Sequence, residues 1–201
     1  MTPRILLPVR PFAEGKTRLA AVLSAAEREA LNQRFFEHVL GVASEVGDCH
    51  VISRSEAVLE AARAAGARAI METGDGLNDA LAQASGVVAA LADTPVMALS
   101  CDLPFLTVDD LTALIAAGKD SDVVAACDTE GHGTNALLLR RPGLIPFRYG
   151  MHSIAAHRAE AEGVGLRFAI VTRQGLGEDI DTPDQLAAMR VRGFYRVSNP
   201  R

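Results

Sequence analysis

Residues 95–104 read Pro-Val-Met-Ala-Leu-Ser-Cys-Asp-Leu-Pro, a strongly apolar run that ends in an acid. A short, continuous apolar run predicts a strand that is buried on both faces, as strands of parallel sheets are. A helix is expected before this strand, over residues 77–91, and another after it, with Thr107 as its N-cap. The stretch therefore indicates an α/β protein.

The same alternation of apolar runs and helical patterns extends to both ends of the chain. Further strands are predicted over residues 5–9, 49–53, 67–71, 122–126, 135–140 and 166–172. Further helices are predicted over residues 24–45, with a capping box of Ser24 and Glu27, over 56–65 with Ser55 as cap and Gly66 as stop, over 153–162, and from Thr182-Pro183 onward. Such units favour a mostly parallel or mixed sheet with helices on both faces, which binds ligands at the carboxyl ends of its strands.

Size and composition bound the classes of function. The chain has 201 residues, which suits one domain over residues 1–190 with a tail over 191–201. The net charge of −5 argues against a nucleic-acid surface, so an anionic substrate must meet a local basic cluster.

No apolar run is long enough for a membrane span and the opening residues do not resemble a signal peptide, so a cytoplasmic protein is expected. The tail, with three arginines, is interpreted as a mobile end or a homodimer contact.

The three cysteines suggest neither a disulfide framework nor a metal site. Cys49, Cys101 and Cys127 are odd in number and far apart, so buried, reduced thiols are expected. Cys101 adjoins Asp102 but should point to the opposite face of its strand, which favours a core residue over a nucleophile.

A basic loop follows the first predicted strand. Residues 8–19 read Pro-Val-Arg-Pro-Phe-Ala-Glu-Gly-Lys-Thr-Arg-Leu, and Arg10, Lys16 and Arg18 would suit a triphosphate. The alternative is a solvated turn with ordinary surface charges. A P-loop is rejected, because that motif requires glycine where Arg10 stands.

Three acids are candidate ligands of Mg²⁺. Asp102 ends the most apolar strand, where a buried charge needs a metal or a hydrogen-bond donor. Asp179 and Asp181 are two residues apart in an extended segment, so both carboxylates should face the same side. Alternatively, Asp102 caps the following turn and Asp181 serves helix initiation.

Two further segments can meet an anion. Residues 131–135, Gly-His-Gly-Thr-Asn, form a flexible turn that presents backbone N–H groups and the Thr134 hydroxyl. Residues 149–153, Tyr-Gly-Met-His-Ser, open a helix whose N-terminus favours phosphate, with His157 one turn beyond Ser153.

Two readings from these loops stay open. Asn78, after the glycine turn of residues 74–76, could contact a nucleotide base, although a helix cap explains it as well. His132, His152 and His157 form no metal-binding pattern and fit structural or surface roles.

Taken in order, these segments resemble the family of 2-phospho-L-lactate guanylyltransferases and related enzymes of coenzyme F420 biosynthesis, within the wider group of Rossmann-like nucleotide-diphospho-sugar (NTP) transferase folds. The resemblance spans nearly the whole chain and is carried by residues 8–11 with 16–19, 76–78, 102–104, 133–137, 149–150 with 153 and 157, and 179–183. It implies that Mg²⁺ is held by Asp102, Asp179 and Asp181, that the phosphorylated acid is held by Thr134, Gly150 and Ser153, and that GTP is received by the Arg10–Arg18 loop with Gly76 and Asn78.

The resemblance leaves the acceptor open. Family members use 2-phospho-L-lactate, phosphoenolpyruvate or 3-phospho-D-glycerate. Arg10 stands where the family usually has lysine, His132 and His152 enlarge a loop that is typically small, and Ile154 replaces a usual phenylalanine.

The expected reaction is attack by a phosphate oxygen of the acceptor on the α-phosphorus of GTP, with Lys16, Arg18 and Asp102 as catalytic residues. One alternative is a cytidylyltransferase of the molybdopterin type, although such enzymes usually carry a glycine-rich first loop that this chain lacks. Another alternative is a non-catalytic nucleotide-binding module.

Overall fold

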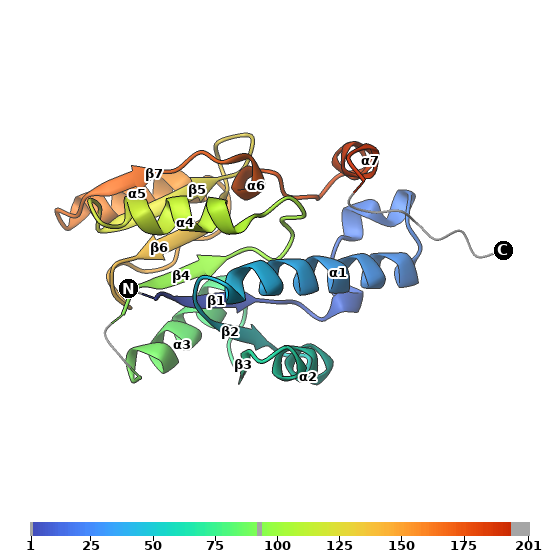
Figure 1. The fold of residues 1–201 in the computed structure, drawn as a ribbon, viewed down its shortest axis with the longest axis horizontal. Helices are drawn as coiled ribbons and strands as arrows, with labels where there is room; N and C mark the ends of the chain where they lie inside the picture. Colours follow the sequence, from blue (N-terminus) through green and yellow to red (C-terminus); the bar gives the residue numbers. More distant parts are fainter. Residues whose placement is uncertain (1, 92–93, 194–201) are drawn as a thin grey trace.

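A seven-stranded sheet forms the centre of the protein (Figure 1), and the computed structural model describes residues 2–91 and 94–193. The strands are β1 Arg4–Pro8, β2 Asp48–Ser53, β3 Arg68–Met71, β4 Val96–Leu99, β5 Val123–Cys127, β6 Thr134–Leu139 and β7 Phe168–Ile170. Their order across the sheet is β3-β2-β1-β4-β6-β5-β7. Strand β6 pairs antiparallel with both β4 and β5, whereas the other recorded pairs are parallel. The first residue of β6 therefore lies at the edge where the parallel strands end.

Helices cover both faces of this sheet, as predicted. They are α1 Ala25–Ser44, α2 Glu56–Ala64, α3 Leu77–Ala89, α4 Val108–Ala117, α5 Ser153–Gly163, α6 Gln174–Gly177 and α7 Pro183–Val191. One hydrophobic cluster joins the sheet to α1, α2, α4 and α6, and a second joins the opposite face to α3 and α5. Figure 1 shows α1 and α4 on one side of the sheet and α3 on the other.

A third apolar cluster lies beyond the end of the sheet. The loop after β1 contains two short 3₁₀ helices, η1 Phe12–Glu14 and η2 Thr17–Ala21, which the sequence analysis missed. Leu19 of η2, Phe35 of α1 and Leu186 of α7 pack together with Ile180. This cluster fixes the basic loop and the acidic segment of residues 179–181 to the same support (Figure 1).

Three of the four residues predicted as N-caps, Ser24, Thr107 and Thr182, make the expected capping hydrogen bonds, whereas Ser55 does not. Ser24, Thr107 and Thr182 all form capping boxes with the residue three positions later. Ser55 stands at the start of α2, but its side chain makes no capping hydrogen bond. The backbone N–H of Ser55 instead donates to the Ser53 hydroxyl at 3.1 Å.

The cysteines are free, as expected, but only Cys49 is fully buried. Cys101 packs against the first cluster and also lines the main cavity, and burial raises the pKa of its thiol well above the ordinary value. This environment disfavours the thiolate, in line with its interpretation as a core residue.

Within the described residues, no helix combines the length and the apolar character that crossing a bilayer requires. The predicted tail falls largely on residues 194–201, which lie outside the described part of the chain.

Candidate active site

A cavity of about 750 Å³ opens at the edge where the parallel strands end. Segments far apart in the sequence meet in its wall. They include Arg10 and residues 15–18 of the basic loop, Gly76 and Leu77 at the start of α3, residues 100–102 after β4, and Asp181. The cavity therefore gathers the predicted basic loop and two of the three predicted acids.

The three acids lie close together. One carboxylate oxygen from each of Asp102, Asp179 and Asp181 lies within 4.8 Å of the other two. Asp179 and Asp181 share a side because the intervening Ile180 points into the third apolar cluster. Burial, followed by the nearby charge of Asp102, raises the pKa of the Asp179 carboxyl to about 6. Such a cluster disfavours full ionisation unless a cation is close.

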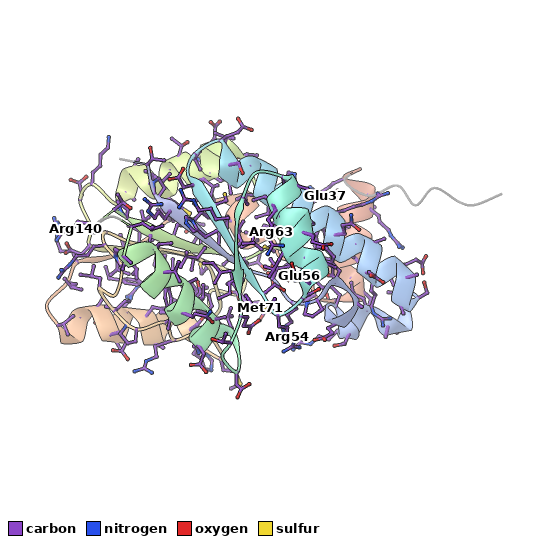
Figure 2. The ribbon with its side chains drawn as sticks, turned by 90° about the horizontal axis from the view of Figure 1, so that it is seen from below. Glu37, Arg54, Glu56, Arg63, Met71 and Arg140 are labelled. Carbon is purple, nitrogen blue, oxygen red and sulfur yellow. The ribbon has the colours of Figure 1, made fainter. Side chains whose placement is uncertain are left out.

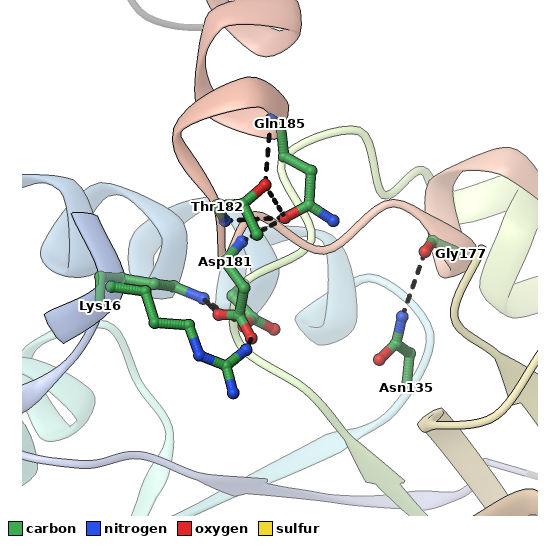
Figure 3. A network of polar contacts seen from close by, with 8 residues as sticks. Lys16, Asn135, Gly177, Asp181, Thr182 and Gln185 are labelled. Carbon is green, nitrogen blue, oxygen red and sulfur yellow. Dashed lines mark hydrogen bonds and ion pairs between the residues drawn. The ribbon is translucent and has the colours of Figure 1, made fainter. Parts of the chain in front are cut away.

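Lys16 supplies that positive charge. Its ammonium contacts Asp102 and lies 2.8 Å from Asp181 Oδ1 (Figure 3), although its side chain is only 7% exposed. Burial alone would lower the pKa of Lys16, but Asp102 and Asp181 together raise it above the ordinary value. Burial likewise opposes ionisation of Asp181, yet the ion pair with Lys16 holds its pKa below the usual range.

The position of Lys16 requires an unusual backbone. Its φ of 57° lies in the left-handed region, which a residue with a side chain adopts at an energetic cost. Its neighbour Arg18 reaches Asp181 at 3.7 Å with a largely exposed side chain. Two of the three cations of the basic loop, Lys16 and Arg18, thus turn toward the acids.

The acidic cluster fits a hard divalent cation. Its donors are all carboxylate oxygens, which Mg²⁺ favours, and they come from two well-supported segments. Two of these carboxylates, those of Asp102 and Asp181, contact Lys16, so the lysine and a metal ion would share ligand residues.

Asn135 holds the two acidic segments together. Its amide donates to the carbonyl oxygens of Leu176 at 3.0 Å and Gly177 at 3.4 Å (Figure 3), just before Asp179. Its backbone carbonyl accepts from the backbone N–H of Ser100, two residues before Asp102, at 2.8 Å. No role was expected for Asn135 from the sequence, although a polar residue within an apolar strand indicates a buried structural hydrogen bond.

The predicted acceptor residues form a second polar cluster outside the cavity wall. The Thr134 and Ser153 hydroxyl oxygens are 2.9 Å apart, and Thr134 Oγ1 is 3.1 Å from His157 Nδ1. All three side chains are buried. Nearby Gly150 has a φ of 141°, which suits glycine and leaves its backbone uncovered by a side chain.

Asn78 joins the two halves of the site. Its amide donates to the Tyr149 carbonyl at 3.0 Å and accepts from the Tyr149 N–H at 2.8 Å. Asn78 is absent from the residues that line the main cavity, whereas Gly76 lines it. Gly76, not Asn78, occupies the N-cap position of α3. The Asn78 amide, which was expected from the sequence to contact a nucleotide base, is thus hydrogen-bonded to Tyr149, just before Gly150.

Two charged residues of the cavity wall escaped the sequence analysis. Arg54 and Glu72 follow β2 and β3 and line the cavity. Arg54 also pairs with Glu14 of the basic loop. Figure 2 shows Arg54 far from Arg140, whose ion pair with Asp122 lies at the opposite end of the sheet. Arg54 and Glu72 each follow the carboxyl end of a parallel strand, which is the position where functional side chains gather in such sheets.

Comparison with known proteins identifies the family. Residues 3–198 match the family model described as guanylyl transferase CofC like. The chain belongs to this family. As a CofC-like guanylyl transferase it is a nucleotidyltransferase, and the predicted family resemblance is confirmed.

Curated relatives cover nearly the same length. The chain is 36% identical over 189 residues to a phosphoenolpyruvate guanylyltransferase of Sphaerobacter thermophilus, covering 92% of this chain and 91% of the relative. It is 32% identical to a 2-phospho-L-lactate guanylyltransferase of Methanocaldococcus sp. (strain FS406-22), covering 94% of this chain and 82% of the relative.

Solved structures confirm the fold. A putative nucleotide-diphospho-sugar transferase from Desulfovibrio desulfuricans G20 superposes with a TM-score of 0.78 at 17% identity, over 98% of this chain and 89% of the other. A CMP:2-keto-3-deoxy-manno-octonic acid synthetase complexed with CTP gives a TM-score of 0.58 at 19% identity, over 96% and 98%. The predicted α/β transferase fold is therefore correct.

Proposed function

We propose that this CofC-like guanylyl transferase joins GMP from GTP to the phosphate of a small phosphorylated acid, with release of pyrophosphate, in the biosynthesis of coenzyme F420. One observation carries the proposal: Asp102, Asp179 and Asp181 lie together beside Lys16, and Lys16, Asp102 and Asp181 line a cavity of about 750 Å³. That volume is within the range of small-molecule pockets. The names of the relatives supply the nucleotide and the class of acceptor.

The three acids are the proposed ligands of Mg²⁺. A bound Mg²⁺ would neutralise phosphate charge and polarise the α-phosphate. Among the chain's own residues, Asn135 and Ile180 keep the acidic segments in place.

The nucleotide is proposed to bind along the basic loop. Arg10, Lys16 and Arg18 supply the positive charge that a triphosphate requires in a protein of net charge −5. Gly76 has a φ of 111° and nothing within 4 Å of the position a Cβ would take, so its backbone can approach the nucleotide closely. Asn78 contributes by holding the Tyr149-Gly150 turn beside the start of α3.

The acceptor is proposed to bind at Thr134, Gly150 and Ser153. A phosphate oxygen of the acceptor forms a bond to the α-phosphorus of GTP while the bond from that phosphorus to the bridging oxygen of pyrophosphate breaks. No general base is required, because a phosphate monoester is mostly dianionic at pH 7. The residues must offset repulsion between two anions and align them, which is the proposed role of Lys16 and Arg18.

Phosphoenolpyruvate, 2-phospho-L-lactate and 3-phospho-D-glycerate are the candidate acceptors. The relatives named for the first two share similar identity with the chain, so the choice depends on residues around the acceptor loops. His132 and His152, whose ring centroids are 5.2 Å apart, lie on the two loops next to Thr134 and Ser153.

A matrix of substrates tests the proposal. The purified protein is incubated with Mg²⁺, each of the four nucleoside triphosphates and each of the three acids, while pyrophosphate and product mass are followed. We expect a guanylylated diphosphate product with GTP alone among the nucleotides. Product with CTP in place of GTP, or no product with any acid, would contradict it.

A further inference from the structure

His157 is a buried residue that the proposed reaction does not yet use. It is 0% exposed, it lies on α5 one turn after Ser153, and both of its ring nitrogens have partners. The Tyr149 ring makes a T-shaped contact with it, with ring centroids 5.1 Å apart. Such a completely bonded imidazole has a defined hydrogen-bond direction.

The backbone of Arg148 fixes that direction. Its N–H points at His157 Nε2 with a distance of 2.9 Å. A backbone N–H can only donate, so Nε2 must be the acceptor and the proton of the neutral ring sits on Nδ1. Nδ1 therefore donates to Thr134 Oγ1, 3.1 Å away.

The remaining hydrogens of the cluster follow from this donation. Thr134 and Ser153 have two hydroxyl hydrogens between them, and the bond that joins their oxygens uses one. Thr134 cannot donate back to Nδ1, because that nitrogen already carries a hydrogen. Whichever hydroxyl donates within the pair, the other hydrogen is left to point away from His157.

We propose that His157 is a positioning residue for the acceptor: it holds Thr134 as a hydrogen-bond acceptor, so that one hydroxyl hydrogen of the Thr134–Ser153 pair is always presented to the acceptor's anionic group. This inference rests on the proposed function of Thr134 and Ser153 as acceptor-binding residues. It adds a direction to their hydrogen bonds and assigns that direction to a residue that does not contact the acceptor.

An uncharged His157 ring suits the proposed chemistry. Burial lowers the pKa of His157 to about 4, with Glu160 opposing and Arg148 assisting this shift, so the ring is uncharged at neutral pH. A hydroxyl group can orient the attacking phosphate by donating a hydrogen bond. A buried imidazolium would instead bring a full positive charge close to the phosphate oxygen, and that charge would hold back the electron pair that must form the new bond.

Two variants separate this role from simple packing. His157→Asn places an amide near Nδ1 and can keep the donation to Thr134, while the N–H of Arg148 loses its acceptor. His157→Gln reaches the Nε2 position and can keep the Arg148 bond, while Thr134 loses its donor. Both changes remove a buried ring and one hydrogen bond, so they serve as matched controls for stability.

The readout is acceptor affinity. Phosphoenolpyruvate, 2-phospho-L-lactate and 3-phospho-D-glycerate are titrated calorimetrically in the presence of Mg²⁺ and a non-hydrolysable GTP analogue, and KM values for acceptor and GTP are measured in parallel. We expect His157→Gln to weaken acceptor binding roughly tenfold, with the KM for GTP unchanged, and His157→Asn to recover most of the affinity. Equal acceptor affinity in the two variants would overturn the positioning role.

The tautomer is a second readout that is independent of turnover. In the protein with ¹⁵N-labelled histidine, long-range proton–nitrogen spectra should show the hydrogen of His157 on Nδ1, with the signal assigned by its loss in His157→Gln. A hydrogen on Nε2 would also overturn the inference. Product formation by the wild-type protein with no contrast between the variants would refute this role alone, whereas absence of product and of acceptor binding would refute the proposed function as well.

Discussion

Lys16 Nζ lies 2.8 Å from Asp181 Oδ1 and also contacts Asp102, so one ammonium bridges acids from two distant segments of the chain. A divalent cation held by Asp102, Asp179 and Asp181 would use two of the same carboxylates. Lys16 and the metal ion should therefore compensate for one another in stabilising the protein.

Replacing Lys16 by methionine tests this compensation. We expect Lys16→Met to lose about 1–3 kcal/mol of unfolding free energy in a chelator, because three neighbouring carboxylates then lack their buried counterion. Added Mg²⁺ should raise the melting temperature of this variant more than that of the wild type. Arg63→Met, which removes a half-exposed ion pair with Glu56 on α2, is the control and should show no such difference (Figure 2). Equal Mg²⁺ responses in Lys16→Met and the wild type would contradict shared ligands.

Replacing Asp102 by asparagine tests the metal site itself. The proposed ligand set loses one charge, so pyrophosphate release should fall by about two to three orders of magnitude. Binding of Mn²⁺, followed by electron paramagnetic resonance, should weaken in parallel. Glu56→Gln makes the same change of charge on α2 and should leave both measurements unaffected. Near-normal pyrophosphate release from Asp102→Asn would remove the assignment.

His157 should make the protein sensitive to mild acid. Its pKa is lowered from 6.5 to about 4 in the folded state by burial, so between these values the unfolded chain binds the proton more readily than the folded protein does. Stability contributed by the neutral ring is thus complete above pH 6.5 and decreases as the pH falls toward 4, by about 2 kcal/mol between pH 7 and pH 5. Urea denaturation at both pH values measures it.

His157→Gln is the reference for this measurement, because His38 and His50, whose pKa values burial also lowers, are present in both proteins. We expect the decrease to be about 2 kcal/mol smaller in the variant. An identical decrease in the two proteins would show that the pKa of His157 is not lowered in the folded state.

Gly175 should tolerate no side chain. A Cβ there would meet the Asp110 carboxylate and would lie 2.5 Å from the Phe105 carbonyl oxygen. Gly175→Ala should therefore push α6 away from α4 and displace the following acids, with a loss of about 1–3 kcal/mol and weaker Mn²⁺ binding.

Gly41→Ala is the control for this substitution. Gly41 lies on the exposed face of α1 with nothing within 4 Å of a Cβ, so alanine should stabilise the protein by about 0.5–1 kcal/mol. Unchanged metal affinity together with unchanged stability in Gly175→Ala would show that this close contact does not support the acidic segment.

The elements and the acids were predictable because their signals are local. The capping boxes at Ser24, Thr107 and Thr182 depend on residues three positions apart, and the shared side of Asp179 and Asp181 depends on a two-residue period. Neither pattern depends on which distant segments pack together in the folded protein.

The remaining features depend on partners that are distant in sequence. The sequence of residues 134–139 does not predict that β6 pairs antiparallel with β4 and β5. The use of the Asn78 amide by Tyr149 requires two loops to meet, and the burial of Thr134 and Ser153 follows from the packing of α5 on the sheet. The sequence therefore proposes Thr134 and Ser153 as acceptor-binding residues but does not predict the hydrogen bonds between them.

The reversal of β6 has an evolutionary consequence. It places the hairpin turn of residues 128–133 at the ligand edge, next to Thr134, while Lys16, Asp102 and Asp181 come from other connections. Lengthening or shortening this one hairpin would thus reshape the proposed acceptor site without changing the segments that are proposed to bind the nucleotide and the metal ion. With the sites as proposed, such a layout would let an enzyme lineage exchange one small phosphorylated acid for another while its use of the nucleotide is inherited.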